Sequence, residues 1–171
     1  MGRDDTSAAS FLVCRDERRL CAFALADVAE TMRPLPLQTL QGMPPFLLGV
    51  ALIRGAMLPV VSLARLLGKA DTDNDAPHLH ANFHSDIHSH QRYVTLKLGS
   101  RQLAVAVQQV LGVRQLGSST LADMPSLLRE AGADVISAIS TLDAELLLVL
   151  KGAHLIADDI WLALEKEAAS A

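Results

Sequence analysis

Aromatic residues are scarce in this sequence of 171 residues, which contains four Phe, one Tyr and one Trp. So few rings do not supply the stacking platform on which proteins bind single-stranded nucleic acids. Basic residues are not in excess either, because the formal net charge is −4, whereas a nucleic-acid binder carries a basic stripe. We therefore expect no nucleic-acid partner, and a core built mainly from Leu, Val, Ile and Ala.

Long apolar runs are also lacking. The longest, residues 46–53, is far shorter than the about 20 residues that span a bilayer. The first ten residues are polar and do not resemble a secretory signal. We expect a soluble, cytoplasmic protein without direct membrane insertion, with residues 1–9 as a disordered tail and Cys14 and Cys21 as reduced core thiols on neighbouring strands.

Motifs of catalysis are missing as well. The sequence contains no GxGxxG fingerprint, no phosphate-binding P-loop, no GxSxG nucleophile elbow and no HExxH zinc helix. The carboxylates are scattered along the chain. The sequence therefore predicts a protein that is not an enzyme and that needs no cofactor.

Pairs of apolar runs indicate two hairpins in the first half. Residues 11–15 and 20–25 flank a charged turn, and residues 49–53 and 57–61 flank a turn at Arg54, Gly55 and Ala56. Within the second hairpin, Pro59 has no N–H to donate, so we expect it at a sheet edge or a bulge.

Short helices are expected at three places. Ser62 is a suitable N-cap for a helix over 63–67 that ends at Gly68, and residues 26–30 form one helical turn. A terminal helix over 153–168 has one apolar face, with Trp161 beside Ile156, Ile160 and Leu164.

The second half of the sequence repeats the first in the order and spacing of its apolar runs. Residues 25–32 align with 107–114, residues 49–53 with 138–142, and the Arg54-Gly55 turn with Asp143-Ala144. Two similar β-units are thus joined through a polar segment at about 69–91. We predict a mainly β fold: two small SH3-like five-stranded β-barrel subdomains packed together, with short helices and a C-terminal helix, forming one domain over 10–168.

Histidines cluster in the joining segment, where five of the six fall between residues 78 and 90. His80, His84 and His88 have a spacing that would put three imidazoles on one helix face, a ligand set for Zn, Ni or Cu. A loop rich in Asp and containing Pro is a poor helix, so we favour a solvated loop. A metal-binding module that uses residues 78–90 remains the alternative.

Residues 46–68 resemble the signature of the CheW family. They contain a glycine (Gly49), an apolar strand, an Arg54-Gly55 turn, a Pro-Val pair and a leucine-rich turn that ends at Gly68. The resemblance extends over about residues 10–165. Ser62 stands where the family commonly has Asp, and both residue types serve as N-caps.

The resemblance implies a non-enzymatic adaptor at receptor arrays on the cytoplasmic side of the inner membrane. Proteins of this family bind the regulatory domain of a CheA-type histidine kinase through barrel ends. They also grip the cytoplasmic tip of a methyl-accepting chemoreceptor in an apolar groove between the barrels.

Carried onto this chain, the resemblance assigns coupling positions to Val28, Glu30, Gly49, Arg54 and Gly55, and kinase contacts to Val113 and Leu116. Physical chemistry fits several of these positions, since Gly49 permits a close backbone approach or a bulge and Gly55 permits a positive φ in the turn. We favour an interface role for Arg54 over that of an ordinary solvated turn residue.

Overall fold

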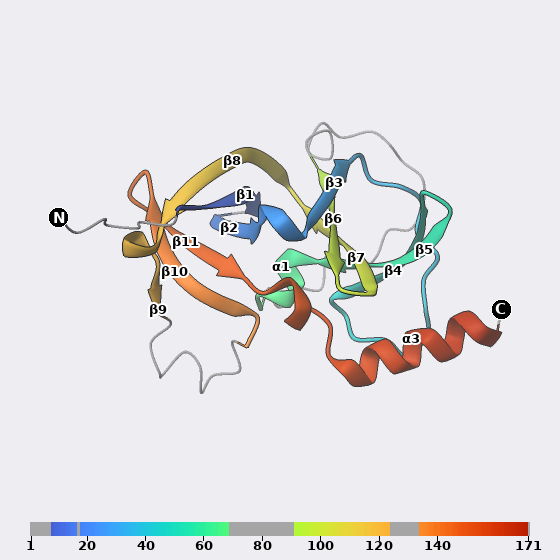
Figure 1. The fold of residues 1–171 in the computed structure, drawn as a ribbon. Helices are drawn as coiled ribbons and strands as arrows, with labels where there is room; N and C mark the ends of the chain where they lie inside the picture. Colours follow the sequence, from blue (N-terminus) through green and yellow to red (C-terminus); the bar gives the residue numbers. More distant parts are fainter. Residues whose placement is uncertain (1–7, 17, 69–90, 124–133, 171) are drawn as a thin grey trace.

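Two antiparallel-rich β-sheets make up most of the protein (Figure 1). The computed structural model describes residues 8–16, 18–68, 91–123 and 134–170. The six-stranded sheet contains, in spatial order, β8 (Gln109–Gly117), β1 (Ala8–Asp16), β2 (Arg19–Ala24), β11 (Glu145–Leu150), β10 (Ile136–Leu142) and β9 (Ala122–Asp123). The five-stranded sheet contains β3 (Val28–Met32), β6 (Arg92–Leu98), β7 (Arg101–Val107), β5 (Ala56–Ser62) and β4 (Leu47–Ile53). The predicted mainly β fold is confirmed, whereas closure of each sheet into a barrel stays a prediction.

The sheets are not divided in the way that the sequence repeat is. The β1–β2 hairpin of the first half joins β8 to β11 of the second half, and the β6–β7 hairpin of the second half joins β3, β4 and β5. Each sheet thus contains a hairpin from the other half of the sequence, and two of the contacts between the halves are parallel pairings, β2 with β11 and β5 with β7. The interpretation of each sequence copy as one β-unit is corrected accordingly, because a repeat fixes the order of strands but not their partners.

Among the described residues, the buried apolar side chains form three clusters. A central cluster lies between the sheets and draws on both, with Phe23 of β2 and Val94 and Leu103 of the β6–β7 hairpin among its members. The six-stranded sheet has a second cluster around Phe11 and Leu147, and the five-stranded sheet has a third around Ile53 and Val60. Because side chains alternate along a strand, each sheet buries apolar residues on both faces.

Local capping confirms the short helix after β5. The Ser62 hydroxyl oxygen accepts a hydrogen bond from the Arg65 N–H at 3.4 Å, and α1 (Leu63–Leu66) follows. Gly68 comes just after the helix with φ +88°, a conformation that suits glycine at a helix C-terminus. Two further short turns are η3 (Ser118–Thr120) and η4 (Gly152–His154).

The helical turn expected over residues 26–30 is wrong in its second half. The 3-10 turn η1 (Leu25–Asp27) closes when the Val28 N–H donates to the Leu25 carbonyl oxygen. From Val28 onward the backbone is extended and pairs with β6 as strand β3. The backbone hydrogen bonds of these residues are made with β6, which is distant in sequence. The local sequence therefore could not predict the strand.

Pro59 lies inside the five-stranded sheet and not at the expected edge or bulge. Its partner in β4 is Val50, whose N–H and C=O bond Gln38 on the outer side at 2.9 and 2.8 Å. The parallel pairing of β5 with β7 begins one residue later, at Val60. The missing N–H of Pro59 therefore costs no ladder hydrogen bond.

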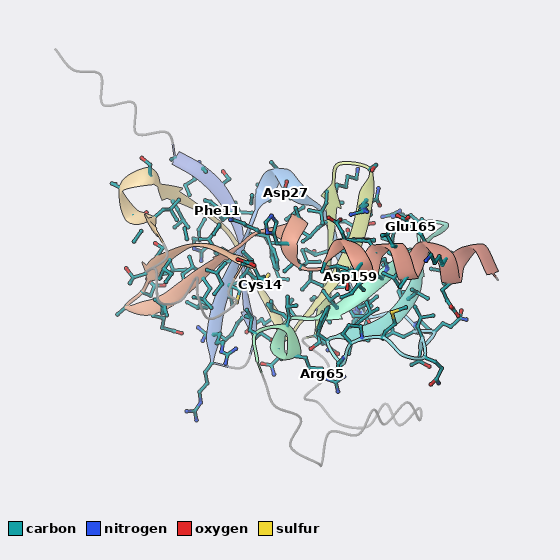
Figure 2. The ribbon with its side chains drawn as sticks, turned by 90° about the horizontal axis from the view of Figure 1, so that it is seen from below. Phe11, Cys14, Asp27, Arg65, Asp159 and Glu165 are labelled. Atoms are coloured by element: carbon teal, nitrogen blue, oxygen red, sulfur yellow. The ribbon has the colours of Figure 1, made fainter. Side chains whose placement is uncertain are left out.

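The C-terminal helix α3 (Asp158–Ser170) runs along the part of the molecule that holds the five-stranded sheet (Figures 1 and 2). Trp161 and Leu164 are buried in the central cluster. Arg101 fixes the start of the helix, since its Nη1 lies 2.6 Å from Asp158 Oδ1 and its guanidinium carbon 5.2 Å from the Trp161 ring centre. In the part of the chain that is described, no helix combines the length and the apolar character that crossing a bilayer requires.

Candidate partner-binding site

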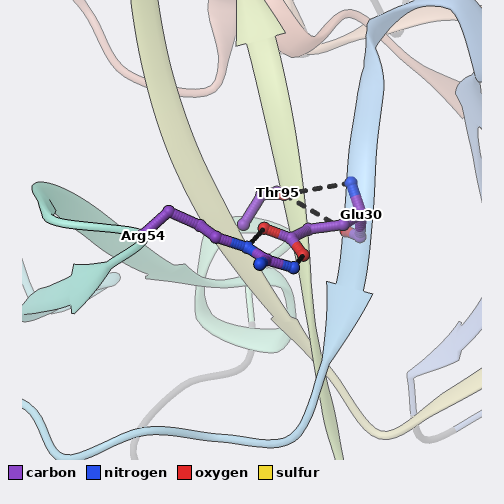
Figure 3. A network of polar contacts seen from close by, with 3 residues as sticks. All are labelled: Glu30, Arg54 and Thr95. Atoms are coloured by element: carbon purple, nitrogen blue, oxygen red, sulfur yellow. Dashed lines mark hydrogen bonds and ion pairs between the residues drawn. The ribbon is translucent and has the colours of Figure 1, made fainter.

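Glu30 and Arg54, two of the predicted coupling residues, form a bidentate ion pair (Figure 3). Arg54 Nε donates to Glu30 Oε1 at 3.1 Å, and Nη2 donates to Oε2 at 2.7 Å. The Arg54 side chain is 78% exposed and the Glu30 side chain 28% exposed. A planar fork matched to both carboxylate oxygens fixes the direction of an arginine that otherwise projects into solvent.

The turn between β4 and β5 places Arg54. Arg54 and Gly55 have φ values of +53° and +81°, as in the two-residue turns that match the twist of a hairpin. The predicted positive φ of Gly55 is confirmed, and a Cβ there would meet open space, so the glycine serves the turn conformation. Asp143 and Ala144 also have positive φ in the β10–β11 turn, where the repeat aligned them with Arg54 and Gly55.

Thr95 of β6 holds the backbone of Glu30. The Glu30 N–H donates to Thr95 Oγ1 at 3.1 Å, and Thr95 Oγ1 donates to the Glu30 carbonyl oxygen at 3.2 Å (Figure 3). The β3–β6 register shifts between Val28 and Glu30, so the threonine hydroxyl replaces part of the interrupted ladder. Sequence reasoning missed Thr95, although a hydroxyl within the otherwise apolar residues 93–96 was a signal.

Gly49 acts through its backbone. The β4–β5 register shifts between Leu47 and Gly49, which confirms a bulge, and Gly49 has φ +144°. A Cβ at this position would collide with the Gln38 carbonyl oxygen, which confirms a close approach too. Since Gly49 is buried, it supports the edge of the sheet and is not itself a contact surface.

A depression of about 470 Å³ opens beside the ion pair. All five strands of the sheet contribute to its lining, which consists of Ala29, Glu30, Ile53, Arg54, Ala56, Leu58, Thr95, Lys97 and Gln102. Ile53 and Leu58 also belong to the third apolar cluster. The depression therefore lies on the same face of the sheet as the third cluster and adjoins it.

The charges in this depression reinforce the ion pair. The hydrogen bonds from Arg54 hold the pKa of the Glu30 carboxyl below its usual value, against the opposing effect of burial, and the charges of Arg54 and Lys97 add to the lowering. The same hydrogen bonds and the Glu30 charge raise the pKa of Arg54. The pair is therefore a carboxylate and a guanidinium at neutral pH.

The remaining predicted site residues lie elsewhere. Val28 is half-buried against the central cluster. Val113 of β8 is 46% exposed, opposite buried Leu12 of β1. Leu116, also on β8, is 6% exposed and packs in the second cluster, so a partner docking there would meet Val113 and not Leu116.

The histidines that suggested a metal site, His80, His84 and His88, lie outside the described residues. Among residues 8–16, 18–68, 91–123 and 134–170, no three side chains of His, Cys, Asp or Glu are grouped as metal ligands.

Comparison with known proteins covers most of the chain. A family model described as CheW-like domain matches residues 10–159. A solved structure, described as the scaffolding protein TtCheW from Thermoanaerobacter tengcongensis, has a TM-score of 0.67 with 16% sequence identity, over 86% of this chain and 92% of that chain. No curated protein matches the chain. At this identity the solved structure shows a common fold.

Proposed function

The chain belongs to the CheW-like domain family, and we propose on that premise that it is a non-enzymatic adaptor coupling chemoreceptors to a CheA-type histidine kinase. Its partners are the regulatory domain of the kinase and the cytoplasmic tip of a methyl-accepting chemoreceptor. It works without a cofactor or nucleic acid, in the cytoplasm at receptor arrays of the inner membrane. It transmits a signal by positioning its two partners.

The observation that carries this proposal is the Glu30–Arg54 pair. Glu30 accepts hydrogen bonds from Nε and Nη2 of Arg54. The Arg54 side chain is therefore held in one direction while 78% of its surface stays exposed. Nη1 and the second hydrogen of Nη2 point away from Glu30 and suit a carboxylate or a carbonyl oxygen of a partner. An arginine that is already oriented loses less side-chain entropy on binding.

Apolar contact area completes the proposed interface. Val28 lies at the border of the central cluster on one sheet, and exposed Val113 lies on the edge strand of the other. We assign Val113 to the kinase contact, with buried Leu116 holding β8 in place. A receptor tip is a helical hairpin, and an apolar helix face docked between two packed units is an ordinary recognition mode.

Calorimetry tests the proposal. The wild-type protein should bind a CheA-type regulatory domain with one-to-one stoichiometry and should also bind a receptor tip fragment. Arg54→Glu should weaken coupling and leave the melting temperature nearly unchanged, because the side chain is largely exposed. Unchanged control of the kinase in that variant would remove Arg54 from the interface, and wild-type protein that binds neither fragment would overturn the function.

A further inference from the structure

A second cation, Lys97, lies in the depression beside Glu30 and Arg54. Alternate residues of β6 point to the same face of the sheet, so Tyr93, Thr95 and Lys97 form one row. Tyr93 and Thr95 are each 3% exposed, whereas Lys97 is exposed at the outer end of the row. Lys97 therefore lines the outer part of the depression, on the same face of the sheet as the Thr95 hydroxyl that holds Glu30.

The charges that line the depression do not cancel. Arg54 and Lys97 are cations, Glu30 is the single anion, and the other lining residues are uncharged. Glu30 already engages Arg54 through both of its oxygens. In the described part of the chain no acidic side chain lies within ion-pair distance of Lys97. The charge of Lys97 nevertheless helps to lower the pKa of the Glu30 carboxyl. The depression thus retains one positive charge and is complementary to an anionic group.

Exposed apolar side chains on the opposite face of the same hairpin indicate that this anionic group belongs to a protein that covers the hairpin tip. Leu52 and Met57 face each other across β4 and β5, one pair before the turn that carries Arg54. They are 62% and 50% exposed. The pair points away from Ile53, Ala56 and Leu58, which line the depression, because side chains alternate along a strand. A free anion leaves the pair in water, whereas a protein that wraps the tip of the hairpin covers it and brings a side chain to the depression.

We infer that Lys97 and the outward side of Arg54 together receive an acidic side chain of the protein partner that docks on the β4–β5 hairpin. The inference rests on the proposed adaptor function and names the partner chemistry at its site. Charge-assisted hydrogen bonds from two cations select a carboxylate over a neutral side chain, and the charge steers the encounter. Lys97 is thus a specificity residue that sequence reasoning did not identify.

The test measures binding of the full-length chain to a CheA-type regulatory domain and to a receptor tip fragment. Lys97→Gln should weaken binding to one of them about two- to fivefold, as expected for a solvent-exposed ion pair. Lys97→Glu should weaken it about tenfold or more and lower the dependence of the association rate on salt concentration. Lys166→Gln removes a positive charge from an exposed side chain of helix α3 and is the matched control, with wild-type affinity expected.

Charge reversal on the partner identifies the acidic residue. Among Asp→Lys and Glu→Lys variants of the affected fragment, one should bind Lys97→Glu more tightly than it binds the wild-type protein. If the wild-type protein binds the fragments and Lys97→Glu binds both with the same affinity, the inference is overturned while the adaptor function stands. A change confined to the affinity for citrate or inorganic phosphate would overturn it in favour of a small anion. Wild-type protein that binds neither fragment would overturn the adaptor function and this inference with it.

Discussion

Glu30 and Arg54 connect opposite edges of the five-stranded sheet. Glu30 lies on β3, one edge strand, and Arg54 on the turn between β5 and the other edge strand, β4. In a flat sheet three to four strand spacings, about 14–19 Å, would separate these strands. Residues of all five strands also line a single depression, which a flat sheet does not allow. The ion pair therefore depends on a strongly curled sheet.

The pair should make stability depend on pH. The folded state lowers the pKa of Glu30 below its ordinary value, so this stabilisation is complete above the ordinary value and is lost as pH falls through the lowered one. Thermal unfolding from about pH 6 to about pH 3 should show a shallower loss of stability for Glu30→Gln than for the wild-type protein. Glu167→Gln removes the same charge from an exposed position of α3, outside the pair. Equal slopes for the two variants would contradict a stabilising role of the pair.

Gly49 should tolerate no side chain. A Cβ there collides with the Gln38 carbonyl oxygen, and φ +144° is outside the range of L-residues. Gly49→Ala should lower the free energy of unfolding by about 2 kcal/mol or more. Gly99→Ala is the matched control, because its φ is +67° and a Cβ meets open space, and it should cost about 1 kcal/mol. Chemical denaturation measures both, and equal costs would show that the close approach to Gln38 does not matter.

The two cysteines should be inert in the folded protein. Cys14 and Cys21 face each other in the β1–β2 pairing and are fully buried with free thiols. Burial raises the pKa of both thiols to about 12, and the nearby Asp16 carboxylate acts in the same direction. An aromatic disulfide reagent at about pH 8 should label both only after denaturation, since the thiolate is the nucleophile. Rapid labelling of the native protein would contradict the buried pairing.

Substitutions of two apolar residues of β8 should have different effects, one on the free energy of unfolding and the other on kinase binding. Leu116 is 6% exposed, so Leu116→Ala should lower the free energy of unfolding by about 2–5 kcal/mol. Val113 is 46% exposed, so Val113→Ala should change it by no more than about 0.5 kcal/mol and weaken binding of the kinase regulatory domain. Denaturation and calorimetry on both variants check this. Full kinase binding by Val113→Ala would remove β8 from the interface.

Local signals predicted local structure well. The Arg54-Gly55 turn, the Ser62 cap and the placement of the two cysteines on neighbouring strands each depend on neighbours in sequence, and the structure shows all of them. The exchange of hairpins between sheets could not be predicted, because apolar runs of similar length and composition do not specify their partners. The same limit applies to Thr95 and Lys97, whose roles depend on the two edge strands, β3 and β4, contributing to one depression.

The predicted contact role of Leu116 shows a different limit. An apolar residue near an interface motif is as consistent with packing as with binding, and only the alternation of β8 against β1 decides between them. The metal-binding alternative for residues 78–90 falls outside the described residues, so titration of Zn or Ni remains its test.

Kinase activity in a reconstituted array tests the coupling claim most directly. Phosphate incorporation into a CheA-type kinase would be followed with receptor-containing vesicles, with and without this protein, and with Arg54→Glu in its place. The adaptor account predicts that the receptor's ligand changes kinase activity when the wild-type chain is present, and that Arg54→Glu loses most of this response. Kinase activity that responds to the ligand equally well without the chain, or not at all with it, would contradict the account.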